Sequence, residues 1–347
     1  MPIEQPNPAL RLAIDGAALA DNWRALDRLS GTAAAGAAVK ADAYGLGARA
    51  CVPVLRDAGC RDFFVAHMAE AVVVAEHVPA DQIAVLHGPH DTADAAFARV
   101  LGVRPVINSL GQARLWIEAG GGTCDLMVDT GMNRLGVALA ELGDPILDGL
   151  QVDTLLSHLA CAEEAVPLNE RQRLRWDEAR RAVPHRRASL ANSAGIMLGA
   201  GYHGDLTRPG LALYGGVPCA ALEGVNRQVV RPEALVIQVR DVPAGETIGY
   251  NATYTAPAPL RIGVISLGYA DGYLRCWSGK GAMLHGDRRL PVLGRVSMDM
   301  TMIDLTEAPD VGEGDWVAAD YALPQAAAIS GLSQYELLTI LGRRFGR

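Results

Sequence analysis

The chain has 347 residues, half of them hydrophobic, and a formal net charge of −8 at pH 7. This length suits two domains with buried cores, and no charge-free apolar run reaches the roughly 18 residues that a transmembrane helix needs. Charges of both signs are interspersed, which argues against a nucleic-acid partner. The first residues lack a basic region followed by an apolar stretch, so we expect no secretory signal and a cytoplasmic protein.

The cysteines and histidines predict neither disulfides nor a metal centre. Six cysteines are scattered without a closely spaced pair, which favours free thiols in a reducing compartment. Four histidines, His67, His87, His90 and His203, lack the spacing of metal ligands.

Short apolar runs alternate with Ala-rich helical stretches between about residues 36 and 210. We expect strands at 37–40, 63–67, 83–87, 103–108, 125–129, 154–158, 188–192 and 203–208. Helical stretches between them include 69–76, 110–119 and 169–183. Eight strands separated by helices predict an α/β fold, a TIM-like (β/α)8 barrel rather than a doubly wound sheet.

The pattern changes after about residue 225. Short alternating runs at 234–239, 262–267, 289–292 and 300–305 are separated by Pro and Gly, which is typical of an antiparallel β domain. Ser333, with Glu336 three residues on, predicts a capped helix over 333–341. We therefore expect a barrel over residues 1–225 and a mainly antiparallel β domain over 226–347, with residues 1–15 able to pair with the second domain.

Polar residues end all eight expected barrel strands, and in a barrel the active site lies at the carboxyl ends of the strands. These residues are Lys40, His67, His87, Asn108, Asp129, His158, Asn192 and Arg208. Packing alone does not account for eight such residues in succession at one end.

Lys40 directly follows an apolar run and lies in the segment 39–47, VKADAYGLG. Burial lowers the pKa of an amine and favours a neutral nucleophile that can attack a carbonyl. Tyr44 can donate its hydroxyl to a phosphate, and the glycines allow a tight turn. The lysine by itself is also compatible with a strand end whose ammonium group reaches solvent.

Segment 39–47 resembles the attachment motif for pyridoxal phosphate (PLP) in alanine racemases, and the resemblance continues along the chain. The matching segments are 128–136, 157–160, 192–195 and 208–215 in the expected barrel, and 249–256, 268–273 and 294–299 in the expected β domain. The resemblance implies a PLP-dependent isomerase that interconverts L-alanine and D-alanine. It also implies a homodimer with shared active sites.

The resemblance assigns the two catalytic bases. Lys40 would carry the cofactor and act as the base on the D-amino-acid face, and the partner subunit's Tyr250 would act on the L face. Arg208 would donate to the pyridine nitrogen, which weakens the electron sink and suppresses transamination. His158 would also bind the cofactor and, together with Arg208, would act on Tyr250 through a chain of hydrogen bonds.

The remaining site residues are likewise implied by the resemblance. The cofactor, chiefly its phosphate, would be bound by Tyr44, Asn192, Ser193, Gly210 and Leu211. The substrate carboxylate would meet Arg134 and the amide of Met298. The substrate entrance would be lined by Tyr269, Glu163, Arg275 and Arg295.

Two positions depart from the family pattern. Met127 stands where many members have a carbamylated lysine, so we expect a chloride, a water or another acid to orient Arg134, or Arg134 to be more mobile. Arg343 is nearest to the place where many members have a gate tyrosine, which would leave the pocket broader.

Three alternatives stay open beside an alanine racemase. One is a racemase of serine or another small amino acid. A second is a related PLP decarboxylase, against which Arg208 argues, because decarboxylases place an acid there. The third is a non-catalytic PLP-binding protein, against which the β domain with Tyr250 argues. D-alanine biosynthesis for the cell wall and D-alanine degradation fit the sequence equally.

Overall fold

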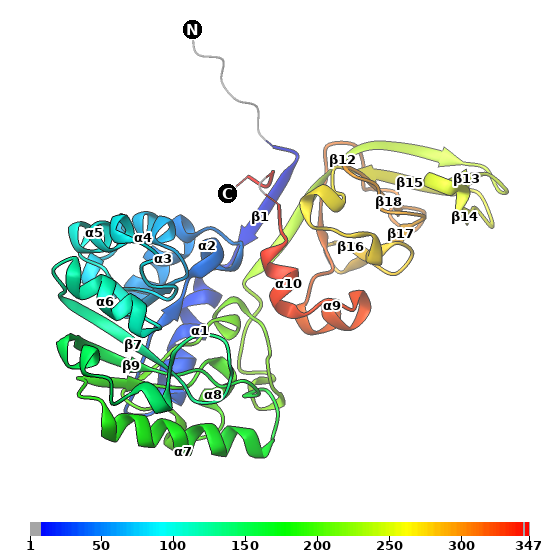
Figure 1. The fold of residues 1–347 in the computed structure, drawn as a ribbon. Helices are drawn as coiled ribbons and strands as arrows, with labels where there is room; N and C mark the ends of the chain where they lie inside the picture. The colour runs from blue at the N-terminus through cyan, green and yellow to red at the C-terminus, as the bar shows by residue number, and fades with distance from the viewer. Residues whose placement is uncertain (1–7, 343, 347) are drawn as a thin grey trace, which may run out of the picture. The chain divides into compact units, whose positions relative to one another are not determined.

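The computed structural model describes residues 8–342 and 344–346, and these divide into two compact units. One unit comprises Gly16–Arg227, and the other combines the described residues before Gly16 with those from Gln228 onward. Figure 1 shows the elements of each unit. None of the helices in the described part of the chain has the length and apolarity needed to span a bilayer.

The first unit is built on a parallel sheet of seven strands, to which the short β8 (Val137–Ala138) adds at β7. In spatial order the seven are β10 (Arg187–Ser189), β9 (Gln151–Leu156), β7 (Thr123–Asp129), β6 (Arg104–Ile107), β5 (Ile83–Val85), β4 (Phe63–Val65) and β3 (Ala37–Ala38). Every neighbouring pair is parallel. Parallel strands joined by helical crossovers are the arrangement that the alternating sequence pattern predicts.

Hydrogen bonds through an eighth strand close this sheet into a barrel. β11 (Leu206–Thr207) pairs in parallel with β2 (Ala34–Ala35), which continues into β3 through Gly36. The amide of Gly36 donates to the Thr207 carbonyl at 2.9 Å, and the amide of Asp205 donates to the Ala188 carbonyl at 2.8 Å. The predicted barrel is confirmed. The first expected strand, 37–40, is shorter than predicted, so Lys40 lies just beyond β3.

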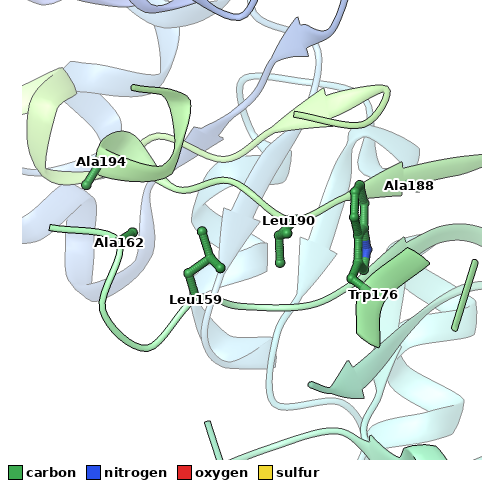
Figure 2. Close-up of a cluster of buried hydrophobic side chains, with 6 residues drawn as sticks. All are labelled: Leu159, Ala162, Trp176, Ala188, Leu190 and Ala194. Atoms are coloured by element: carbon green, nitrogen blue, oxygen red, sulfur yellow. The ribbon is translucent and has the colours of Figure 1, made fainter. Parts of the chain in front are cut away.

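Helices follow the strands, and their ends have local causes. They are α1 (Gly16–Leu29), α2 (Lys40–Tyr44), α3 (Ala48–Ala58), α4 (Met68–Ala75), α5 (Thr92–Leu101), α6 (Leu110–Glu118), α7 (Pro167–Ala182) and α8 (Ser193–Ile196). Asp91 and Ser109 cap α5 and α6 by accepting main-chain amides at 2.9 and 3.1 Å. Figure 2 shows Trp176 of α7 in one apolar cluster with Leu159 and Leu190, which fixes the loop after β9.

Buried ion pairs fill the amino-terminal end of the barrel. Arg187 donates to Asp62 at 2.9 Å and to Asp153 at 3.0 Å, and Arg104 lies 3.3 Å from Asp62 and 3.4 Å from Asp125. Each charge has an opposite partner, which offsets the loss of hydration on burial. The polar strand ends singled out in the sequence lie at the other end of the barrel.

The second unit is a closed antiparallel β barrel. Its strands run in the order β1 (Leu10–Ile14), β12 (Val230–Val242), β15 (Leu260–Ile265), β18 (Thr301–Asp304), β17 (Arg288–Leu293), β16 (Ala282–His285) and β19 (Trp316–Ala319). The long β12 pairs with both β15 and β19, which closes the sheet. β13 (Thr247–Ile248) and β14 (Tyr254–Thr255) form a small antiparallel pair beside it.

Two helices end the second unit, α9 (Leu323–Ser330) and α10 (Gln334–Thr339). The hydroxyl of Ser333 accepts the Glu336 amide at 3.2 Å, and the Glu336 carboxylate accepts the Ser333 amide at 2.8 Å. The predicted capping box is therefore confirmed, and a barrel followed by an antiparallel β domain is the fold of this chain.

Candidate active site at the carboxyl ends of the barrel strands

Lys40 begins a turn with an uncommon backbone. The four residues after it, Ala41 to Tyr44, all have φ between 53° and 55°. Residues with a side chain disfavour this left-handed region by about 1–2 kcal/mol each. Hydrogen bonds hold the turn: the Ala43 amide donates to the Val39 carbonyl at 2.8 Å, and Asp42 accepts the Ala48 amide at 2.7 Å. The backbone from which Lys40 extends is thus fixed by contacts on both sides.

The surroundings of Lys40 favour its neutral amine. Burial lowers the pKa of Lys40, and the positive charges of Arg134 and Arg208 lower it further. The carboxylate of Glu70 opposes them and raises it. A neutral amine near physiological pH is the form that attacks a carbonyl carbon, so this environment suits covalent catalysis.

Arg208 is buried and holds its guanidinium against polar atoms at the ends of β9 and β10. It donates to Ser189 Oγ at 2.5 Å and to the Ser157 carbonyl at 2.5 Å, and its Nη2 lies 3.4 Å from His158 Nδ1. Burial lowers the pKa of Arg208 to about 10, while the charge of Asp125 opposes that shift. Arg208 therefore stays protonated near neutral pH and can only donate hydrogen bonds.

His158 is neutral in this setting. Burial lowers its pKa to about 3, and the cations Arg208, Arg134 and Lys40 add to the effect. Because Arg208 can only donate, Nδ1 of His158 accepts and Nε2 carries the proton. Gln172 fixes the main chain here, donating to the His158 carbonyl at 3.0 Å and accepting the Ala160 amide at 2.9 Å.

A neutral, buried His158 predicts a specific acid sensitivity. Between about pH 6.5 and about pH 3 the unfolded chain protonates this ring and the folded chain does not, so the free energy of unfolding falls as pH falls. We expect His158→Asn to lose less stability than the wild type when Tm is followed from about pH 6.5 to about pH 4. The exposed His90→Asn is the control and should follow the wild type. If Tm fell equally with pH in His158→Asn and the wild type, the ring would protonate in the folded protein as readily as in the unfolded chain.

Ser193 and Tyr44 form a cradle with Gly210, in which the expected amide donor, Gly210, is already bonded to Ser193. Ser193 Oγ accepts the Gly210 amide at 2.9 Å and the Ala212 amide at 3.3 Å, which leaves its own hydrogen to donate elsewhere. Burial raises the pKa of Tyr44 to about 12, so its hydroxyl keeps its proton. The Tyr44 ring lies against Tyr214, with centroids 4.9 Å apart. Of the other expected cofactor residues, Asn192 caps α8 through the Gly195 amide at 2.9 Å, and Leu211 is buried in the segment Leu211–Tyr214.

Gly210 has no room for a side chain. A Cβ there would clash with the Tyr44 hydroxyl and lie 3.0 Å from Tyr44 Cζ and 3.4 Å from Ala38 Cβ. We expect Gly210→Ala to displace Tyr44, to lower stability by about 1–3 kcal/mol and to weaken PLP binding in a titration of the cofactor-free chain. Gly143→Ala is the control, because its Cβ meets no atom within 4 Å. Equal PLP affinity for Gly210→Ala and wild type would exclude the cradle from cofactor binding.

The segment that carries Arg134 is held by Asp129, whose Oδ1 accepts the amides of Gly131 at 2.8 Å and Met132 at 2.9 Å. Arg134 itself is exposed within this chain, and no acid of the described residues forms an ion pair with it. Met127 is buried in β7. No described carboxylate thus stands in for that carbamate as an ion-pair partner of Arg134.

The other predicted residues lie mainly in the second unit. Tyr250 is 66 % exposed and Met298 is 53 % exposed. The guanidinium of Arg275 lies over the Tyr269 ring, 5.2 Å from its centroid. Arg295 is half-buried in the second unit, whereas Glu163 is exposed in the first. Arg343 lies outside the described residues.

Sequence reasoning missed several residues that hold the site together. Ser157 and Ser189, the partners of Arg208, lie within predicted strands, and a small hydroxyl inside an apolar run was the available signal. Gln172 and Glu70 lie on helices and reach the strand ends through side chains. Nothing in their local sequence distinguishes them from ordinary surface residues.

Comparisons with known proteins agree with the geometry. The family model described as "Alanine racemase, N-terminal domain" matches residues 14–218, and "Alanine racemase, C-terminal domain" matches residues 229–347. A protein of Methylobacterium nodulans named alanine racemase is 44% identical, covering 97% of this chain and 95% of its own length. A Rhizobium meliloti protein of the same name is 42% identical, covering 97% and 96%.

A solved structure resembles the whole chain. It is the alanine racemase of Bartonella henselae, described with covalently bound pyridoxal phosphate, with a TM-score of 0.89 and 34% identity over 99% of both chains. The likeness therefore extends over both units, and not over the parallel barrel alone.

Proposed function

The chain belongs to the alanine racemase family, and on that premise we propose that it interconverts L-alanine and D-alanine with pyridoxal phosphate bound to Lys40. The observation that carries the proposal is the setting of Lys40. Its partly buried amine lies among the charges of Arg134 and Arg208 at the carboxyl ends of the barrel strands. Active sites of barrel enzymes lie at this end.

The residues present fit the cofactor. Bound PLP withdraws electrons from the substrate and so acidifies the hydrogen on its Cα. Ser193 has a hydroxyl hydrogen to offer a phosphate, the Tyr44 hydroxyl beside it stays protonated, and Gly210 has no Cβ that would clash with Tyr44. Arg208 can only donate, so a ring nitrogen bound to it stays unprotonated, which favours return of the proton to Cα.

Racemisation needs one proton-transferring group on each face of Cα. Lys40 serves the D face through its amine, and the partner subunit's Tyr250 serves the L face through its hydroxyl. The 66 % exposure of Tyr250 within one chain leaves it available to a second copy, and the enzyme is proposed to act as a homodimer with shared sites. Arg134 and the amide of Met298 bind the substrate carboxylate, and the exposed Glu163, with Tyr269, Arg275 and Arg295, lines the entrance.

The direct test is incubation of the purified protein with L-alanine, followed by chiral analysis for D-alanine. Borohydride then fixes the cofactor, and peptide mapping locates it. The chain has two lysines, Lys40 and Lys280, so the assignment is a choice between two peptides. Conversion toward equal L and D forms, with label on Lys40, supports the proposal. Label on Lys40 with conversion of serine but not alanine would change the substrate, and absence of bound PLP would overturn the proposal.

A further inference from the structure

One carboxylate connects the ends of two neighbouring barrel strands beside Lys40. Glu70, the third residue of α4, accepts the Ala41 amide through Oε1 at 2.7 Å and the Ala66 amide through Oε2 at 2.7 Å. Ala41 directly follows Lys40, and Ala66 directly follows β4. Glu70 thus connects the turn of Lys40 to the end of the adjacent strand.

Helix capping does not explain these contacts. A glutamate at the third helical position ordinarily accepts the amide of the residue before the helix, which here is His67. The distance from Glu70 to the His67 amide is 3.3 Å, longer than either of the other two bonds. The shorter bonds go to residues outside the helix, so the carboxylate is placed for the strand ends.

The hydrogen bond to Ala41 lies at the start of the left-handed segment of the backbone. Ala41 is the first of the four left-handed residues, and such residues persist only when their surroundings hold them. Hydrogen bonds to an ionised carboxylate are about twice as strong as neutral ones. Glu70 supplies such a bond from α4, an element separate from the turn itself.

We propose that Glu70 is a positioning residue for Lys40: its carboxylate holds the left-handed turn against β4, so that the amine is presented in one place. This inference rests on the proposed function of Lys40. The carboxylate also has an electrostatic effect, because its negative charge raises the pKa of Lys40 while burial and Arg134 lower it. Positioning and charge are separable by substitution.

Two variants separate them. Glu70→Gln keeps the length but loses the charge, and its amide has one oxygen to accept with, so it cannot serve both strand ends. Glu70→Asp keeps the charge but is shorter by one methylene and cannot reach both amides. Glu76→Gln is the matched control, since Glu76 ends the same helix and pairs with Arg49 on the surface.

Three measurements distinguish positioning from general stability. The first is kcat and KM for alanine, and the second is Tm. The third uses the full-length chain after removal of its cofactor: brief acetylation with acetic anhydride over a range of pH, with Lys40 and Lys280 read as separate peptides. Lys280 is exposed and gives the profile of an ordinary amine.

We expect kcat to fall by about 100-fold in both Glu70 variants, because small misplacements of a reacting group have effects of this size, while KM changes little. The acetylation profile of Lys40 should move to lower pH in Glu70→Gln but not in Glu70→Asp, since the charge is lost in the first alone. Glu76→Gln should match the wild type throughout.

The inference is overturned if either folded Glu70 variant keeps a kcat close to that of the wild type. It is also overturned if the acetylation profile of Lys40 is unchanged in Glu70→Gln, or if Glu76→Gln loses as much activity. Should Glu70→Gln not fold, the kcat of Glu70→Asp decides. A wild-type chain that does not fix PLP at Lys40 would overturn the proposed function as well, whereas normal fixation with unaffected variants overturns this inference alone.

Discussion

Lys40→Ala is expected to abolish racemisation, with a loss of about 10⁴-fold or more in kcat/KM. Under the proposed function, the substitution would remove both the covalent attachment point and one of the two proton-transferring groups, and a general base alone contributes about 10²–10⁴-fold. Burial and neighbouring cations lower the pKa of Lys40, a setting that the exposed Lys280 lacks, so we do not expect Lys280 to replace it. The checks are chiral analysis of the product and the visible absorbance of the purified protein.

Lys280→Ala is the matched control for this experiment. Lys280 is the second of the two lysines and is exposed, so its removal should leave activity and absorbance unchanged. Activity that survives Lys40→Ala, with borohydride-fixed cofactor on Lys280, would refute the assignment of Lys40. Loss of activity in both variants would indicate a general effect on the fold.

Tyr250→Phe is expected to reduce racemisation by about 10²–10⁴-fold, the range for loss of one proton-transferring group. The variant keeps the ring and removes the hydroxyl. Lys40 still serves its own face, so D-alanine should exchange its Cα hydrogen with deuterated water without inversion. Tyr254→Phe, four residues along in β14, is the control and should behave as the wild type. Normal inversion by Tyr250→Phe would exclude its hydroxyl from proton transfer.

Mixing the two inactive variants tests whether the site is shared between subunits. In a twofold dimer, a heterodimer of Lys40→Ala and Tyr250→Phe has one site with both residues intact and one with neither. Random exchange of equal amounts should restore about a quarter of the wild-type activity. A mixture whose subunits exchange but which stays inactive would place Tyr250 in the site of its own chain.

Arg208 interacts both with residues at the strand ends and with a charge inside the barrel. Its guanidinium is buried against Ser157 and Ser189, and the charge of Asp125, part of the ion-pair cluster at the opposite end of the barrel, raises its pKa. Asp125 in turn lies 3.4 Å from Arg104. The charge of Arg208 is therefore stabilised in part by a carboxylate of the ion-pair cluster at the other end of the barrel.

The sequence predicted those parts of the fold whose signal is local. Strands of the parallel barrel are buried on both faces and appear as continuous apolar runs, so all eight were located. In the β domain the runs at β12, β15, β17 and β18 were located, but β16 and β19 were not. The sequences of these two, AMLH and WVAA, do not alternate between polar and apolar residues. Pairing with each other and with neighbouring strands defines them.

At the candidate site, too, local sequence patterns revealed some features and the folded structure alone revealed others. The sequence alone determined that Lys40 and Arg208 follow barrel strands, because an apolar run ending in a charge is a local pattern. Only the tertiary structure decided that Arg208 binds Ser157 and Ser189, and that Glu70 holds the turn after Lys40. Those contacts join residues 19 to 51 positions apart in the sequence. The left-handed turn is unfavourable by itself and is stabilised only when residues such as Glu70 form hydrogen bonds with it. Such a conformation has no signature in local propensity, because contacts made across the barrel stabilise it.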